Sequence, residues 1–182
     1  METYMSHVEH YRYDPEKEIL LQNARKLIQS REWSYASHLL REVLNLTPKD
    51  PEALQLLGTC FLERKEFSAA KICFQEIYKI HENDVTCWLL GDVCEKMSDY
   101  RGAKRYLLKA AILAKDDNPF LFEIFKTLGN IFVREGDWAS AEENYNKALR
   151  LMPESDVLQV NYGTLELQKT NIDLAKSHFR EA

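Results

Sequence analysis

Apolar residues recur at spacings of three and four over residues 122–153, in two blocks separated by a polar turn at residues 135–137. This spacing places the apolar side chains of each block on one face of an α-helix. Gly129 interrupts the first block, where a glycine lowers helix propensity by about 1 kcal/mol relative to alanine. We therefore predict two amphipathic helices that pack closely at Gly129 and end at Pro153.

The same arrangement recurs along almost the whole chain. Four sets of positions keep one register, with successive steps of 34, 33, 38 and 34 residues. The small residues of the first helices are Ala24, Gly58, Gly91, Gly129 and Gly163. Those of the second helices are Ala36, Ala70, Ala103, Ala141 and Ala175. Large residues follow these alanines by four positions at Leu40, Phe74, Leu107, Tyr145 and Phe179. Others precede them by three at Trp33, Phe67, Tyr100, Trp138 and Ile172. Shared periodicity of this kind predicts stacked helix pairs.

This order of large, small and proline positions resembles the tetratricopeptide repeat, a helix-turn-helix unit of about 34 residues. The resemblance covers residues 17–182 and implies an all-α, right-handed α-solenoid of antiparallel helix pairs. We predict an N-terminal tail over residues 1–14 and a repeat domain over residues 15–182. The repeats, four complete and one truncated, are expected at about residues 17–50, 51–83, 84–117, 118–155 and 156–182.

The ends of the repeat domain are expected to differ. The first repeat, with helices at about 16–30 and 33–46, fits the pattern least well, as terminal repeats often do. The fifth repeat stops near the middle of its second helix, at Ala182. Solenoids usually carry a polar capping element at such an end. We therefore expect either a fragment of a longer protein or a homo-oligomer that associates through this open end.

The third and fourth repeats are separated by an insertion of about four residues, close to one helical turn. With Asn118 as cap and Pro119 in the first helical position, the next helix is predicted to start one turn early. The displayed residues 120–122 either form an apolar contact site or fold back on the third repeat, which we favour. Nearby, either Cys87 takes the core position and Trp88 faces the groove, or the helix start is rotated and Trp88 is buried. We favour burial.

Composition excludes several classes of protein. The net charge of −5 and the pI near 5.6 argue against a nucleic-acid surface, which requires a basic face. No apolar run approaches 18 residues, so we predict no membrane insertion. The polar, mixed-charge N-terminus does not resemble a secretory signal. We expect a cytoplasmic protein.

No catalytic or metal-binding set emerges from the sequence. Cys60, Cys73, Cys87 and Cys94 lie in helical patterns without C-x-x-C spacing and are interpreted as buried apolar residues in a reducing compartment. His7 and His10 lack further ligands nearby, which makes a metal site improbable. Without a phosphate loop or a nucleophile–base set, we predict no enzyme activity, no cofactor and no metal.

The resemblance implies that a protein or peptide partner binds in the concave groove, which the first helix of each repeat lines. The groove residues carried over onto this chain are Arg25, Gln29, Gln55, Thr59, Asp92, Lys126, Asn130, Arg134, Asn161 and Thr164, with Glu63, Glu95 and Gln168 beside them. Together with Glu52, these make the first three repeats mainly acidic and the last two basic and amide-rich. Such a wall suits charged or polar segments.

Lys126, Asn130 and Asn161 also resemble the first part of a carboxylate clamp, by which some members of the family bind the acidic C-termini of chaperones. The two basic residues that complete that clamp are absent, and asparagine is common at both positions in the family. A general interaction groove is therefore the favoured prediction. The alternatives are a self-assembling scaffold and the regulatory arm of a larger signalling or enzymatic protein.

Overall fold

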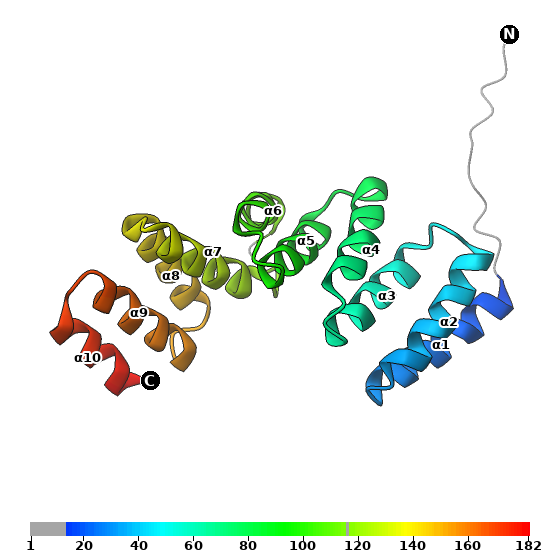
Figure 1. The fold of residues 1–182 in the computed structure, drawn as a ribbon, viewed down its shortest axis with the longest axis horizontal. Coiled ribbons are helices and arrows are strands. Elements are labelled where there is room, and N and C mark those ends of the chain that lie inside the picture. The colour runs from blue at the N-terminus through cyan, green and yellow to red at the C-terminus, as the bar shows by residue number, and fades with distance from the viewer. Residues whose placement is uncertain (1–13, 116) are drawn as a thin grey trace, which may run out of the picture.

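The fold is known from a computed structural model that describes residues 14–115 and 117–182 (Figure 1). The described residues form α-helices and no strand. The helices are α1 Pro15–Gln29, α2 Trp33–Leu46, α3 Pro51–Glu63, α4 Phe67–Ile80, α5 Asp84–Lys96, α6 Tyr100–Leu113, α7 Leu121–Glu135, α8 Trp138–Leu151, α9 Asp156–Gln168 and α10 Ile172–Glu181. The all-α solenoid predicted from the repeats is confirmed.

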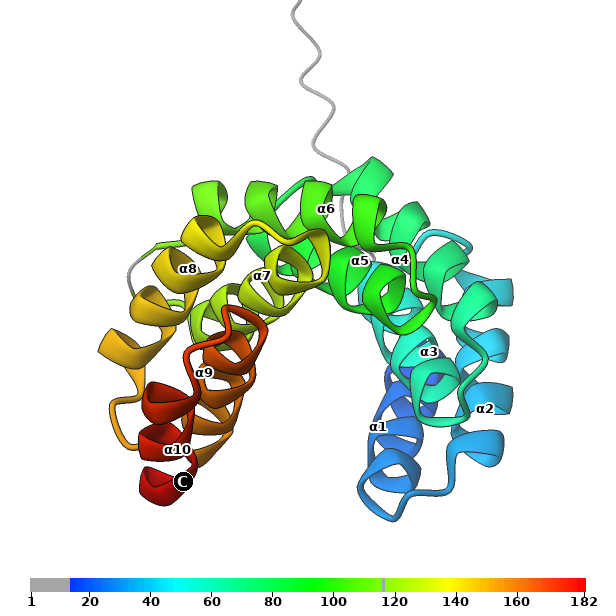
Figure 2. The ribbon, with the colours of Figure 1, turned by 60° about the vertical axis from the view of Figure 1, so that its left-hand side comes forward.

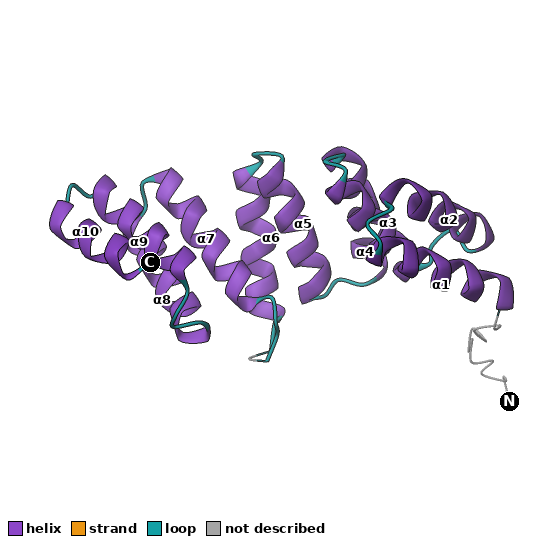
Figure 3. Ribbon diagram, turned by 90° about the horizontal axis from the view of Figure 1, so that it is seen from below, coloured by secondary structure: helices purple, strands orange, loops and turns teal. Residues whose placement is uncertain are grey.

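The helices stack as antiparallel pairs that curve into an arch. The odd-numbered helices line its inside and α2, α4, α6 and α8 lie on its outside (Figure 2). Seen from below, the pairs follow one another in a single row from α1 to α10 (Figure 3). Every pair of described helices with substantial contact belongs to the same repeat or to adjacent repeats. The arch is therefore built from neighbours in the sequence alone.

Short polar residues begin many of these helices. The side chains of Asp14, Asp50, Asp99 and Asp137 each accept a hydrogen bond from a backbone N–H in the first helical turn. Asn83 forms a capping box with Thr86 at the start of α5. These bonds satisfy N–H groups that have no partner within the helix.

One residue with positive φ follows the first helix of each pair. These residues are Arg31, Lys65, Ser98, Gly136 and Thr170, with φ between 60° and 75°. In every pair, the next residue donates its N–H to a carbonyl in the last turn of the helix, as Asp137 does to Phe132 at 3.0 Å. This is the usual way in which a helix ends before a tight reversal. Only the turn at residues 135–137 places a glycine in this conformation.

The small residue of each first helix receives the large residue sixteen positions later. A Cβ atom added to Gly58 would overlap the Phe74 ring, and one added to Gly91 would lie 2.6 Å from Leu107 Cγ. Gly129 faces Tyr145 in the same way, and Gly163 faces Phe179. Phe74, Leu107 and Tyr145 are buried. The glycines therefore allow the two helices of the second to fifth pairs to approach closely, as predicted from the sequence at Gly129.

The start of α7 corrects one prediction. Pro119 is not in a helix, and α7 begins at Leu121 rather than one turn early. The Asn118 carboxamide accepts a hydrogen bond from the backbone N–H of Phe120 at 2.7 Å and donates to Asp84 at 2.6 Å. Asn118 therefore holds a loop against α5 instead of capping a longer helix. The inserted residues lengthen the connection between repeats, because contacts with α5 outweigh the local helix-start signal.

Phe120 folds back on the third repeat, the alternative that we favoured. Its ring stacks on Trp88, with the ring centroids 4.0 Å apart and an angle of 15° between planes. Cys87 is fully buried in the core, whereas Trp88 is only partly buried. The favoured prediction, a rotated helix start with Trp88 buried, is wrong, because Cys87 holds the core position and Trp88 is only partly buried. Trp88 lies outside the core, and the inserted loop covers it.

Helices α1 to α8 supply one pair for each of the first four predicted repeats, and α9 and α10 supply the fifth. The division into a tail and five repeats at the stated boundaries remains a prediction. Residues 1–13, including His7 and His10, lie outside the described residues.

Candidate functional site

The inner face of the arch carries the side chains that the helix pairs do not bury. Three rows run across the first helices, six and three residues before the small residue and one residue after it. The first row is Glu18, Glu52, Val85, Glu123 and Val157. The second row is Gln55, Trp88, Lys126 and Val160, and its position in the first repeat is held by Leu21, which is buried in the core. The third row is Arg25, Thr59, Asp92, Asn130 and Thr164. We call this surface the groove face.

At the N-terminal end of the groove face, Arg25 links two acidic residues. Its Nε atom donates to Glu52 Oε1 at 2.8 Å, and its Nη1 atom lies 3.4 Å from Glu18 Oε1. The hydrogen bond to Glu52 raises the pKa of the guanidinium further. The acidic wall predicted here is therefore partly neutralised within the protein.

The other sequence-predicted residues of this end make few contacts. Gln29 and Gln55 are exposed. The Thr59 hydroxyl donates to the Gln55 carbonyl oxygen at 3.0 Å, within the same helix. These side chains are open to a partner, and Gln55 keeps its carboxamide available for hydrogen bonds.

The middle of the groove face combines an ion pair with the Trp88 stack. Asp92 lies 2.8 Å from Lys96, one turn later in α5. Trp88 and Phe120 stack on each other, so each ring covers one face of the other. The third repeat therefore contributes the Asp92 carboxylate and this ring pair to the groove face. The inserted loop thus shapes the groove face directly.

Lys126 and Asn130 share one face of α7, but each already has a partner. Lys126 Nζ lies 2.5 Å from Glu123 Oε2 and 5.4 Å from the centre of the Phe122 ring. The Asn130 side-chain oxygen accepts a hydrogen bond from the Tyr145 hydroxyl at 2.7 Å. Asn130 is thus tied to the core residue behind it, which sequence spacing alone did not reveal.

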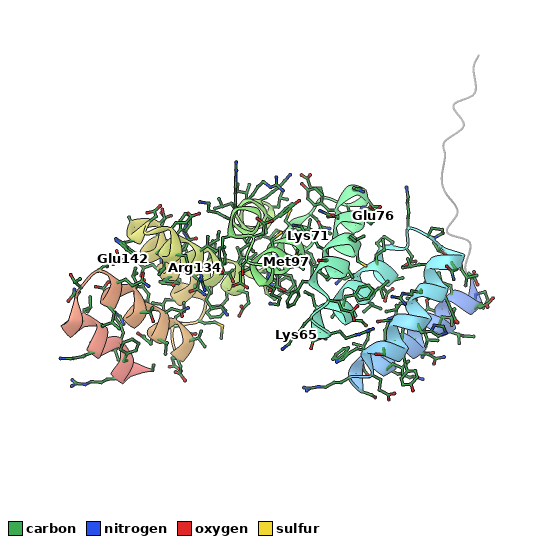
Figure 4. All side chains as sticks on the ribbon, in the orientation of Figure 1. Lys65, Lys71, Glu76, Met97, Arg134 and Glu142 are labelled. Atoms are coloured by element: carbon green, nitrogen blue, oxygen red, sulfur yellow. The ribbon has the colours of Figure 1, made fainter. Side chains whose placement is uncertain are left out.

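Arg134 lies at the end of α7, near the turn to α8 (Figure 4). Its guanidinium carbon is 4.9 Å from the centre of the Tyr100 ring, which belongs to the preceding repeat. A guanidinium over an aromatic face is stabilised by the ring quadrupole. Arg134 is therefore both an exposed cation of the groove face and a contact between repeats.

Asn161 differs from the other amides of the groove face. Its side-chain nitrogen is buried and has no hydrogen-bond partner among the described residues. A buried donor without a partner costs free energy, so it favours an added acceptor. The neighbouring Thr164 hydroxyl donates to the Val160 carbonyl at 2.9 Å. Of the three clamp-like residues, Asn161 alone has a buried donor without a partner among the described residues.

Two apolar residues of the groove face were missed in the sequence. Val157 and Val160 on α9 are 54% and 45% exposed. They occupy the positions held by Glu123 and Lys126 one repeat earlier. The sequence does contain an indication of them, because the apolar residues of α9 lie on both sides of the helix rather than along one stripe. Helical spacing alone assigns such apolar side chains to the core.

The outer side of the arch carries a hollow of about 360 Å³ between α6 and α8. Leu108 and Ile112 form one side of it, and Phe125, Leu128 and Phe132 of α7 lie among its lining residues. The positions of Leu108 and Ile112 hold polar residues in the first, second and fourth repeats. Ala111 is small where those repeats have a leucine or a tyrosine. The apolar α6 side of this hollow is therefore specific to the junction that carries the insertion.

The four cysteines are buried and unpaired, as predicted. Burial raises the pKa of each thiol, to about 11 for Cys73. Raised thiol pKa values make these sulfurs poor nucleophiles at neutral pH. Within residues 14–115 and 117–182, no group of three or more histidine, cysteine or acidic residues is placed to hold a metal. No described helix is long and apolar enough to cross a membrane.

Comparison with known families identifies the repeat. Residues 84–154, which include α5 to α8, match the family model described as tetratricopeptide repeat. Residues 84–154 are tetratricopeptide repeats. Proteins of this fold act as scaffolds for protein–protein interaction and use the extended concave surface of the stack. The resemblance that the four sets of repeated positions indicated is thereby confirmed.

Solved structures agree with this assignment. MamA from Desulfovibrio magneticus RS-1 matches with a TM-score of 0.84 and 20% identity, over 92% of this chain and 93% of MamA. YrrB, described as a tetratricopeptide-repeat protein with an unusual peptide-binding site, matches with a TM-score of 0.74 and 21% identity. That match covers 89% of this chain and 82% of YrrB. At such identities the likeness establishes the fold alone.

A curated relative extends the comparison to a multiprotein assembly. The BBSome complex member BBS4 of Bos taurus is 23% identical over 161 residues. The match covers 88% of this chain but only 30% of the relative. The chain therefore corresponds to less than a third of that protein.

Proposed function

We propose that this tetratricopeptide-repeat protein binds an extended or helical segment of a protein partner along its groove face. The observation that carries the proposal is the continuous inner surface of the arch, to which each repeat contributes one helix. Its exposed side chains are not required to fill the core, and Asn161 leaves a donor unsatisfied. The mechanism is recognition without chemistry, by an adaptor that we place in the cytoplasm.

The comparisons support the same class of function. YrrB is described as having a peptide-binding site, and BBS4 as a member of a complex. The groove residues that we assign to the partner are those predicted from the sequence. We give the largest role to Gln55, Lys126, Asn161 and Thr164. Lys126 and Thr164 are bonded only within their own helices, whereas Asn130 and Arg25 are held by hydrogen bonds to other helices. A partner must compete with Glu123 for Lys126.

The test is affinity capture from the native lysate with mass spectrometry, comparing the wild type with Lys126→Glu. Lys147→Glu is a matched control on the outer helix α8. Lys147 lies 2.7 Å from Glu143 and 5.6 Å from the Phe125 ring centre, much as Lys126 lies near Glu123 and Phe122. We expect a partner that the wild type and Lys147→Glu retain and that Lys126→Glu captures at least about ten-fold less. Equal capture by all three would contradict groove binding at α7.

A second function, self-association through the end of the solenoid, rests on a different observation. Phe179 is 42% exposed, whereas the equivalent Tyr145 is 2% exposed beneath the next repeat. A second copy that covers α10 would bury this ring. Light scattering at increasing concentration should then show dimers that Phe179→Glu abolishes, whereas a wild-type monomer at every concentration would remove this alternative.

A further inference from the structure

The third and fifth repeats begin their first helices alike. Asp84 and Val85 open α5, and Asp156 and Val157 open α9, in each case seven and six residues before the glycine. Three residues before the glycine stand Trp88 and Val160. We call Asp84, Val85 and Trp88 the third-repeat edge, and Asp156, Val157 and Val160 the fifth-repeat edge. The second and fourth repeats have a charged residue in place of the valine that opens these helices.

The third-repeat edge is already occupied by the chain itself. The Asn118 amide nitrogen donates to Asp84 Oδ2 at 2.6 Å, and two residues later Phe120 stacks on Trp88. The bond from the Phe120 N–H to Asn118 Oδ1, at 2.7 Å, fixes the shape of this short segment. The segment therefore occupies this edge as a bound peptide would: the Asn118 amide donates to the Asp84 carboxylate, and the Phe120 ring covers Trp88.

The equivalent surface of the fifth repeat is open. Val157 and Val160 are 54% and 45% exposed, and the side chain of Asp156 is exposed beside them. Glu154, which is also exposed, adds a second negative charge next to Asp156. A surface with two apolar side chains and two carboxylates is complementary to an apolar or aromatic residue that follows a cationic or amide donor.

We propose that the fifth-repeat edge binds a partner segment with an amide or cationic side chain two residues before an aromatic one. In this segment the donor binds Asp156 and the aromatic ring packs on Val157 and Val160, as Asn118 and Phe120 do at the third-repeat edge. The proposal deepens the groove function proposed above and rests on it. A valine offers less surface to a ring than Trp88 does, so the contact is weak alone and requires other groove contacts for affinity.

The test uses the ¹⁵N-labelled full chain and a synthetic peptide, Lys-Asn-Pro-Phe-Leu-Lys, followed by NMR. We expect chemical-shift changes centred on residues 154–164, with half-saturation on the order of 1 mM or tighter. Replacing the peptide's Phe or Asn by Ala should weaken binding by at least about five-fold. A peptide with Asp in place of both Lys residues should bind less tightly, because its charge repels Asp156 and Glu154.

Two variants of the chain complete the test. Val160→Glu should abolish the shifts, and Leu167→Glu should preserve them. Leu167 lies on the same helix and is 48% exposed, close to the 45% of Val160, but it lies outside the fifth-repeat edge. No shifts at residues 154–164, equal binding of the alanine peptides, or shifts confined to residues 84–88 would each overturn the proposal. If the peptides fail while Lys126→Glu still loses its captured partner, groove binding stands and only this subsite is rejected.

Discussion

The fourth and fifth repeats show how similar sequence patterns lead to different environments. In the fourth repeat, Gly129 receives Tyr145, which is 2% exposed because α9 packs beside it. In the fifth repeat, Gly163 receives Phe179 in the same way, yet Phe179 is 42% exposed. The sequence pattern determines which side chains meet within a helix pair. Burial depends on whether another helix pair packs against the first, so residues at equivalent positions differ in exposure along the stack.

The largest expected effect tests this difference at the two glycines. Gly129→Leu should lower the free energy of unfolding by about 3 kcal/mol, because Tyr145 is enclosed and cannot yield. Gly163→Leu should cost only about 1 kcal/mol, because the Phe179 ring can move toward solvent. Urea denaturation followed by circular dichroism measures both changes. Equal losses would show that the end of the stack is as rigid as its interior.

A second test uses the tyrosines at the junction of these two repeats. Tyr162 packs against Tyr145 with ring centroids 5.2 Å apart, and burial raises the pKa of Tyr162 to about 12. A raised folded pKa means that the associated stability is complete below the unfolded value near 10 and is lost as pH rises toward 12. We expect stability to fall by about 2 kcal/mol across this window.

Tyr162→Phe should lessen that alkaline fall and leave the part due to Tyr145, whose pKa burial also raises. The variant also removes the hydrogen bond to Asn146 and so lowers stability at neutral pH. Thermal melts at a series of alkaline pH values provide the measurement. A fall as steep in Tyr162→Phe as in the wild type would assign the pH dependence to other groups.

The covered and uncovered edges provide a third comparison. Phe120→Ala should destabilise the protein by about 1–2 kcal/mol, because it exposes the face of Trp88 and removes a stacked pair. Val160→Ala should change stability by less than about 0.5 kcal/mol, since this valine already faces solvent. Tryptophan fluorescence during unfolding reports the first change, which a wild-type emission maximum in Phe120→Ala would contradict.

The turns of the two repeats differ in the residue that adopts positive φ. Gly136 adopts φ 75° in the fourth repeat, whereas the β-branched Thr170 adopts φ 64° in the fifth. Positive φ is costly for residues other than glycine. Thr170→Gly should therefore stabilise the chain by about 1 kcal/mol and Gly136→Ala should destabilise it by a similar amount. Calorimetric melting temperatures that move in the same direction in both variants would contradict this interpretation.

The smallest effect is expected at the groove face. Lys126→Glu loses the ion pair with Glu123, but surface pairs contribute only about 0.5 kcal/mol, so the melting temperature should hardly change. A large loss of stability would make Lys126 a structural residue and would remove it from the candidate site.

The sequence predicted the helix pairs because one physical requirement repeats five times. Each first helix needs a small residue where a large one enters sixteen positions later, and that spacing is visible without coordinates. The path of the inserted loop was not predictable in the same way. Asn118 and Pro119 are correct helix-start residues by local rules, but the stack of Phe120 on Trp88 depends on how two repeats meet.

The candidate site was predictable in place but not in detail. Helical spacing put Lys126 and Asn130 on one face. It did not show that Glu123 forms an ion pair with Lys126 or that the Tyr145 hydroxyl donates a hydrogen bond to Asn130. The link from Arg25 to Glu52 joins adjacent repeats, so it depends on their angle as well as on their sequence. Val157 and Val160 were missed because apolar side chains were assigned to the core.

The restriction of contacts to adjacent repeats gives the arch a mechanical property. Among the described helices, substantial packing joins only the same or adjacent repeats, so the curvature of the arch is the sum of small rotations at four successive junctions. Tension between its two ends would be absorbed by these rotations before any core is broken. A partner that fits the inner face at one curvature would stiffen the arch, and pulling the arch straighter would release that partner.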